Sequence, residues 1–306
     1  MSGDAGDAGE AGNKRLRSSS STPAVPIATA KNINDSFAWV SHVLRQSAAL
    51  LGKSQELNSN NHWFADLSAA WFGISISTCF SGIGSPEFAS ECISHFFCAM
   101  MCIPQSHVRC IAAVEKDHLA RAELQASTRP PEHIFETMES FLNPFAGTRK
   151  CVNRISEMTW PECVKWVHQA SAITACAPCL VCGDDCVYGT ADMNVSGPPC
   201  TDWSTQGLRD GAWGATWLAT CVYFMQRRQC REKALAHENV PPFMVSILQD
   251  MLEDLYIVQT LILCPSVYGW PIARRRRITI LLLRSELEAC ICPYDQCTEA
   301  LRRHCT

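Results

Sequence analysis

The sequence predicts an α/β fold in which helices cover both faces of a mostly parallel β-sheet. Short apolar runs of strand length alternate with longer amphipathic stretches through most of the chain, and this alternation is typical of parallel sheets. Hydrophobic residues make up 47% of the 306 residues and charged residues 18%, which indicates a globular chain rather than a disordered one. A chain of this length can bury a substantial core.

Seven apolar segments have the length and flanking residues expected of strands. They are residues 73–80, 109–115, 134–135, 192–196, 234–238, 256–263 and 278–283. The amphipathic stretches between them predict helices near 86–101, 117–126, 160–175, 213–230 and 241–254. None of the apolar runs reaches the ~18 residues that a membrane-spanning helix needs, so no membrane association is expected.

Four segments of different composition divide the chain. Residues 1–30 are of low complexity and are predicted to form a disordered tail, because they cannot bury enough apolar surface to offset the entropy of ordering. Residues 31–60 carry apolar side chains at three- and four-residue steps and predict an N-terminal helical segment. The globular domain is expected over residues 65–290, followed by a short C-terminal tail at 291–306.

The net charge limits the kinds of binding surface that the chain can form, and the cysteine content indicates the redox state of its cellular compartment. The net charge of -4 excludes a basic surface over the whole chain, so a nucleic-acid contact needs a local patch. The 19 cysteines are odd in number and no secretory signal opens the chain, which favours a reducing compartment over secretion. Lys14, Arg15 and Arg17 form a basic cluster that is either part of a solvated tail or a nuclear-import signal. We expect the nucleus in a eukaryote and the cytoplasm otherwise.

A glycine-containing turn and an acidic residue follow the first two expected strands. The turn contains Phe80, Gly82 and Gly84 and leads directly into a helix, which lets backbone approach a ligand closely. Glu115 ends the next strand, where an acid of a nucleotide-binding α/β fold accepts hydrogen bonds from ribose hydroxyls. Separately, these features would be a tight turn and a surface glutamate; together they favour a cofactor that contains a ribose.

A stiff loop follows the expected strand at 192–196. Two prolines, the second of which is Pro199, precede Cys200 and place it at the carboxyl end of the sheet, where open α/β folds bind ligands. A cysteine on a rigid polar loop is a candidate nucleophile once it is deprotonated. The alternative, given 19 cysteines, is a small buried hydrophobic residue.

Two further groups lie at the ends of later strands. Glu238 belongs to a Glu-Asn-Val sequence, and a carboxyl group in that position can donate a proton or a hydrogen bond. Arg274 and Arg276 belong to a run of four arginines before the last expected strand. Such a run is either a solvated basic face or a clamp for phosphates or a base carbonyl oxygen.

The order of these motifs, FSGIG, VEKD, GPPCTDWS, ENV and YGWPIARRRR, resembles the C5-cytosine DNA methyltransferase family over residues 72–284. The resemblance implies a Rossmann-like fold, S-adenosylmethionine as the cofactor and DNA as the partner, with tRNA as the alternative substrate. The residues that match the cofactor site are Phe80, Gly82, Gly84, Glu115 and Pro199, and those that match the catalytic site are Cys200, Glu238, Arg274 and Arg276.

The resemblance also implies a mechanism. The Cys200 thiolate would add to C6 of cytosine, while Glu238 would hydrogen-bond the N3 and N4 edge. The target base would have to be flipped out of the duplex. A truncated homologue that only binds cofactor or nucleic acid is the non-catalytic alternative.

Several positions depart from the family pattern. Ile272 stands in place of the glutamine of the arginine motif, and Thr137, with Glu136 as a substitute, stands where an aspartate usually contacts the adenine. Only residues 285–306 follow the region that resembles the family. We therefore expect the usual target-recognition region and C-terminal motif to be lacking, and a partner chain could supply target recognition. The helix expected after Asn34 is either a circularly permuted substitute or a packing helix.

One cysteine cluster lies outside the family pattern. Cys176, Cys179, Cys182 and Cys186 have a C-x2-C-x2-C-x3-C spacing that occurs in ferredoxin-type iron–sulfur proteins and also suits tetrahedral zinc. The third interpretation is an insertion that carries free thiols. The sequence favours free thiols, so we expect no metal and retain these four residues as weak candidates only.

Overall fold

The structure is a computed structural model, and it describes residues 73–100, 107–144, 155–204, 207, 209–268 and 272–289. The predicted disordered tail at 1–30 and the predicted helical segment at 31–60, with the basic cluster between Lys14 and Arg17, lie outside the described residues. The predicted C-terminal tail at 291–306 lies outside them as well.

The described residues contain nine strands and six α-helices, with short 3-10 helices in the connections. The strands are β1 (Ser75–Cys79), β2 (Arg109–Val114), β3 (His133–Phe135), β4 (Cys176–Pro178), β5 (Asp185–Val187), β6 (Met193–Ser196), β7 (Ala234–Asn239), β8 (Tyr256–Leu263) and β9 (Arg276–Leu283). The α-helices are α3 (Ser85–Met100), α4 (His118–Ala126), α6 (Trp160–Val167), α7 (Trp217–Cys230), α8 (Val245–Leu252) and α9 (Arg284–Ala289). The 3-10 helices are η2 (Met138–Phe141), η3 (Ile155–Glu157), η4 (Ala170–Ala172), η5 (Gly211–Trp213) and η6 (Pro265–Tyr268).

Seven strands form one sheet in the order β3-β2-β1-β6-β7-β9-β8. The pairs from β3 to β7 are parallel, whereas β9 runs antiparallel to both β7 and β8. The order reverses direction between β1 and β6, and open α/β sheets bind ligands beyond the carboxyl ends of the strands at such a point. The predicted Rossmann-like, mostly parallel fold is therefore confirmed.

The register aligns the carboxyl ends of four neighbouring strands. Cys79 in β1 pairs with Val114 in β2 and with Ser196 in β6, and Val114 pairs in turn with Phe135 in β3. Because these pairs share one level of the sheet, the loops that follow all four strands emerge side by side.

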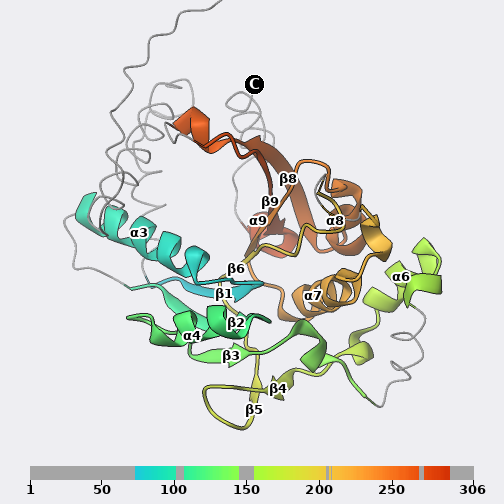
Figure 1. The fold of residues 1–306 in the computed structure, drawn as a ribbon, viewed down its shortest axis with the longest axis horizontal. Helices are drawn as coiled ribbons and strands as arrows, with labels where there is room; N and C mark the ends of the chain where they lie inside the picture. Colours follow the sequence, from blue (N-terminus) through green and yellow to red (C-terminus); the bar gives the residue numbers. More distant parts are fainter. Residues whose placement is uncertain are drawn as a thin grey trace, which may run out of the picture.

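Helices pack on both faces of the sheet, with α3 and α4 on one side and α6, α7 and α8 on the other (Figure 1). Alternate residues of β2 face opposite sides of the sheet. Ala113 packs with Leu124 of α4, whereas Ala112 and Val114 belong to the larger core on the side of α7. This alternation follows from the two-residue period of side chains along a strand.

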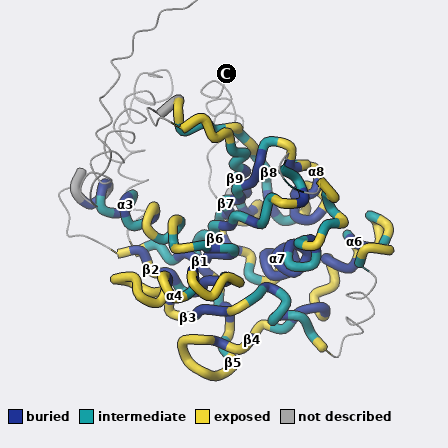
Figure 2. Tube along the Cα trace, viewed as in Figure 1, coloured by how far each residue is buried: buried dark blue, intermediate teal, exposed yellow. Residues whose placement is uncertain are grey.

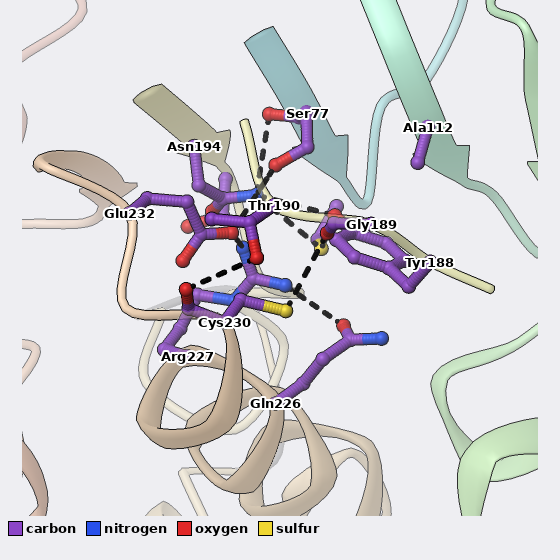
Figure 3. A network of polar contacts seen from close by, with 12 residues as sticks. Ser77, Ala112, Tyr188, Gly189, Thr190, Asn194, Gln226, Arg227, Cys230 and Glu232 are labelled. Carbon is purple, nitrogen blue, oxygen red and sulfur yellow. Dashed lines mark hydrogen bonds and ion pairs between the residues drawn. The ribbon is translucent and has the colours of Figure 1, made fainter. Parts of the chain in front are cut away.

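Helix α7 is the most buried helix of the described part and is dark blue along most of its length in Figure 2. Its buried residues include the polar Gln226 and Arg227 beside Tyr223 and Phe224. Figure 3 shows why burial of the guanidinium is tolerated: Arg227 forms an ion pair with the buried Glu232. A buried cation needs such a partner, because an unpaired charge inside a protein is strongly unfavourable.

The structure departs from the predicted elements at three places. The helix predicted over 160–175 ends at Val167, and the short helix η4 follows it. The strands β4 and β5 form an antiparallel hairpin where no strand was predicted, since each strand has only three residues and carries no apolar run. Helix α9 follows β9 near the end of the predicted domain, where no helix was predicted.

Candidate cofactor and catalytic site

A pocket with a volume of about 290 Å³ opens at the aligned carboxyl ends of β1, β2, β3 and β6. The N-terminal part of α7 and the residues just before it form another wall. The lining residues are Phe80, Gly82, Val114, Glu115, Lys116, Glu136, Thr137, Met138, Glu139, Gly197, Pro199, Ala215, Thr216 and Ala219.

The loop after β1 has a backbone conformation that depends on its glycines. Gly82 and Gly84 have φ angles of 57° and 91°, in the left-handed region that glycine adopts without steric cost. Phe80 is also left-handed, at 58°, and its N–H donates to the Val114 carbonyl at 2.8 Å. Phe80 and Gly82 line the pocket, whereas a Cβ on Gly84 would contact Leu124 of α4, so Gly84 faces the helix packing.

Glu115 joins the glycine loop to the start of α4. Its carboxylate accepts hydrogen bonds from the N–H of Gly82 at 2.6 Å and from the N–H of Asp117 at 2.8 Å. Asp117 in turn caps α4, because its side chain accepts from the N–H groups of Leu119 and Ala120. The VEKD sequence therefore supplies both an acid that lines the pocket and the cap of the next helix.

Three carboxylates and one ammonium group belong to residues that line the pocket. The acids are Glu115, Glu136 and Glu139, and the base is Lys116. Arg121 pairs with Glu136 at 3.4 Å and offsets part of this charge. The lining is acidic overall and suits a ligand that carries positive charge.

One hydrogen bond from β7 and two within the loop hold the Pro-Pro-Cys segment in place. The Asn239 side chain donates to the Pro198 carbonyl at 3.4 Å, and the Cys200 carbonyl accepts from the N–H groups of Trp203 and Ser204 at 3.0 and 2.7 Å. Pro199 lines the pocket, and Cys200, the next residue, is half-buried. The loop thus places the half-buried Cys200 directly after a residue of the pocket wall.

Glu238 lies next to this loop and forms an ion pair with Arg276. A Cβ on Gly197 would lie 3.4 Å from Oε2 of Glu238, and Nε of Arg276 lies 2.6 Å from its Oε1. The structure therefore brings Glu238 and Arg276 together beside the Pro-Pro-Cys loop. Arg274 lies exposed before β9 and is not drawn into this pair, and Arg277 donates to the Pro241 carbonyl.

Asp202 also belongs to the site, although no motif in the sequence marks it as a site residue. It is buried, and its carboxylate accepts from the N–H and Oγ1 of Thr216 at 3.1 and 2.6 Å. A Cβ on Gly214 would lie 2.1 Å from the carboxyl carbon of Asp202, so only glycine fits there. The hydrogen bonds between Asp202 and Thr216 join the loop after Cys200 to the start of α7. In the sequence, only the Gly-x-Thr spacing of Gly214 and Thr216 could have indicated this contact.

The cysteine cluster differs from the predicted set of four. Cys179, Cys182 and Cys186 converge with His133, which no spacing argument had indicated. Cys176 is exposed on β4 and does not belong to this group. The hairpin that carries the cysteines lies beyond β3, at the opposite end of the sheet from β8 and β9 (Figure 1).

The fold and the pocket define the class of the protein as an open, mostly parallel α/β sheet with a ligand pocket at the carboxyl ends of its strands. Residues 184–300 match the family described as C-5 cytosine-specific DNA methylase. This segment contains the Pro-Pro-Cys loop, the Glu-Asn-Val sequence and the arginine block, so the predicted resemblance to that family is confirmed. No curated protein matches the chain significantly.

Several solved structures are similar to part of this chain. A protein described as a DNA modification methyltransferase from an E. coli prophage is 16% identical, with 70% of this chain and 47% of that chain covered and a TM-score of 0.41. The Entamoeba histolytica methyltransferase EhMeth is 12% identical, with 69% and 53% covered and a TM-score of 0.40. The S. pombe Dnmt2 methyltransferase is 12% identical, with 69% and 49% covered and a TM-score of 0.36. The chain spans about half the length of these structures.

The helices that the structure describes are all too short or too polar to cross a lipid bilayer.

Proposed function

We propose that the chain is an S-adenosylmethionine-dependent methyltransferase that acts on C5 of cytosine in DNA. The observation that supports this most is the arrangement around one pocket. The glycine loop and Glu115 line it, Pro199 forms part of its wall, and the half-buried Cys200 follows Pro199 directly. The ion pair of Glu238 with Arg276 lies beside the same loop.

The chemistry of the pocket fits the cofactor. S-adenosylmethionine carries a sulfonium and an ammonium group, and the lining supplies three carboxylates against one lysine. Glu115 is the acid that would hold the ribose hydroxyls, while Phe80, Gly82 and Pro199 would contact the rest of the cofactor. Bound S-adenosylmethionine supplies the methyl group. The match of residues 184–300 to the cytosine methylase family supports the same cofactor.

The residues beside the pocket account for activation of the base. The thiolate of Cys200 adds to C6, which makes C5 nucleophilic. Glu238 hydrogen-bonds the N3 and N4 edge and supports protonation of N3, so that negative charge does not accumulate on the ring. Arg276 steadies the O2 side, and Arg274 contacts neighbouring groups. After methyl transfer, loss of the C5 proton restores the aromatic ring and the carbon–sulfur bond breaks.

Covalent trapping tests the proposal. In 5-fluorocytosine the fluorine at C5 cannot leave as a proton, so the chain should remain bonded to the base through Cys200. We expect a DNA adduct with S-adenosylmethionine that survives denaturing electrophoresis, located at Cys200 by peptide mass spectrometry. The same experiment with a matched RNA distinguishes the two polymers.

Two variants control the trapping experiment. Cys200→Ala should form no adduct, whereas Cys176→Ala, which removes an exposed thiol on β4, should react like the wild type. An adduct at another cysteine, or none with either polymer while the cofactor still binds, would contradict the catalytic role of Cys200. An adduct with RNA alone would contradict DNA as the substrate.

A further inference from the structure

Histidine, cysteine, aspartate and glutamate side chains can bind metal ions. Within the part of the chain that the structure describes, one group of such side chains comes close enough to share an ion. It consists of His133, the first residue of β3, and three cysteines around the turn between β4 and β5: Cys179, Cys182 and Cys186. Their ligand atoms all lie within 4.8 Å of one another. His133 is 46 residues distant in sequence from Cys179, so the fold, not the local chain, assembles the group.

The distances agree with a single tetrahedral ion. Zinc bonds of about 2.3 Å to sulfur and about 2.0 Å to nitrogen, at the tetrahedral angle, separate a sulfur ligand from a nitrogen ligand by about 3.5 Å. Nδ1 of His133 lies 3.6 Å from Sγ of Cys179 and 3.5 Å from Sγ of Cys182. Two of the three sulfur–nitrogen distances in the proposed ligand set therefore agree with tetrahedral zinc.

The backbone around Cys179 supports the same conclusion. Gly183 follows Cys182 with a φ of 80°, and its N–H donates to the Cys179 carbonyl at 2.9 Å. The turn therefore folds back on itself, and the sulfur atoms of Cys179 and Cys182 both lie beside Nδ1 of His133.

A second set of contacts joins the turn to β3. The Leu180 N–H donates to the Ile134 carbonyl at 2.8 Å, and Cys179 forms an antiparallel bridge with Phe135. These bonds place the three cysteines beside His133 at the edge of the main sheet.

We propose that His133, Cys179, Cys182 and Cys186 bind one zinc ion. Three thiolates and one imidazole are a ligand set typical of zinc, and softer sulfur ligands disfavour magnesium, calcium and manganese. Since the protein supplies all four ligands, no coordination position remains for water or substrate, and the site is structural rather than catalytic.

The ion would fasten the hairpin to the strand that leads into the cofactor pocket. β3 ends at Phe135, and Glu136 and Thr137, the next residues, line the pocket. The hairpin has only two three-residue strands and exposes the apolar side chains of Leu180, Val181 and Val187. Such a hairpin is marginally stable by itself, so a metal clip would account for its order.

Metal analysis of the full chain, purified without chelator, tests this proposal without reference to enzymatic activity. We expect about one zinc ion per chain, as for a closed four-ligand site. Cys182→Ser and His133→Ala should each lose the zinc, and both change side chains outside the deeply buried core. Cys176→Ser is the matched control, because Cys176 lies in the same hairpin but outside the group, and it should retain the zinc.

Cobalt gives a second readout. Replacement of zinc by Co²⁺ in the wild type should produce the visible absorption of tetrahedral cobalt with thiolate charge-transfer bands, and Cys182→Ser should lose it. Wild-type chain without bound zinc, or zinc content equal in Cys182→Ser and Cys176→Ser, would overturn the proposal. Iron together with acid-labile sulfide in place of zinc would also overturn it. None of these outcomes depends on whether the chain methylates cytosine.

Discussion

Nε of Arg276 lies 2.6 Å from Oε1 of Glu238. The two residues belong to adjacent antiparallel strands, β7 and β9, and the pair lies beside Gly197 at the start of the Pro-Pro-Cys loop. The arginine block had two interpretations in the sequence, a solvated basic face or a clamp within the site. For Arg276 the contact with Glu238 supports the second, while Arg274 remains exposed.

Glu238→Gln should lower the rate of methyl transfer by about 10²–10⁴-fold, the range for removal of a positioned acid or base. The affinity for S-adenosylmethionine should stay close to the wild-type value, because Glu238 does not line the pocket. Single-turnover transfer of labelled methyl groups and calorimetric titration of the cofactor measure the two effects. The control is Glu253→Gln, an exposed acid at the end of α8. Methyl transfer by Glu238→Gln at the wild-type rate would contradict the proposed catalytic role of Glu238.

Glu115→Ala should weaken binding of S-adenosylmethionine by about 1–3 kcal/mol, because charged hydrogen bonds to the ribose are lost. The substitution also frees the N–H of Gly82 from its 2.6 Å bond, so the glycine loop should become less ordered. Isothermal titration calorimetry measures the affinity. Glu123→Ala, on the exposed side of α4, is the matched control. Equal affinity in the two variants would show that Glu115 does not hold the cofactor.

Arg227→Met should destabilise the fold by about 3–5 kcal/mol, because it leaves the buried carboxylate of Glu232 without a countercharge. The guanidinium also lies 4.9 Å from the ring centre of Tyr188 and 5.4 Å from that of Tyr223. The double variant Arg227→Met, Glu232→Gln should recover part of the loss, since no unpaired charge remains. Urea unfolding measures the free energies. Arg109→Ala, which breaks an exposed ion pair with Glu132, should change stability by under about 1 kcal/mol.

Stability should also fall as the pH falls from about 6.5 towards 4, in part because of His237. Burial lowers the pKa of this imidazole from 6.5 to about 4. The unfolded chain therefore takes up the proton first, and below pH 6.5 protonation favours unfolding, by up to ~3 kcal/mol near pH 4. Urea unfolding of the wild type and of His237→Leu across this range isolates the contribution. The stability difference between the two should change with pH in that window; a constant difference would contradict the lowered pKa.

Much of the fold and part of the pocket could be predicted from local patterns. All seven strands of the main sheet lie within one or two residues of their predicted limits, because most of them contain apolar residues in a short segment bounded by polar or turn residues. Phe80, Gly82, Glu115 and Pro199 line one pocket, as expected of groups that follow parallel strands. The β4–β5 hairpin could not be predicted, since its strands are too short and exposed to leave a periodic pattern.

The sequence motifs could not predict contacts between segments that are distant along the chain. Glu139 and Ala219 line the pocket through the packing of η2 and α7, and no local feature marks either residue. Asp202 acquires its role only because Thr216 and Gly214 come beside it.

The order of the apolar runs and of the short motifs was enough to specify an α/β sheet, the cytosine methylase resemblance and most of the candidate site, because these depend on residues close together in the chain. Tertiary structure alone decided that β9 runs antiparallel, that Arg276 and not Arg274 meets Glu238, and that His133 replaces Cys176 beside three cysteines. The physical reason is the same in each case: strand pairing and helix packing bring together side chains whose separation along the chain carries no information about their distance in space.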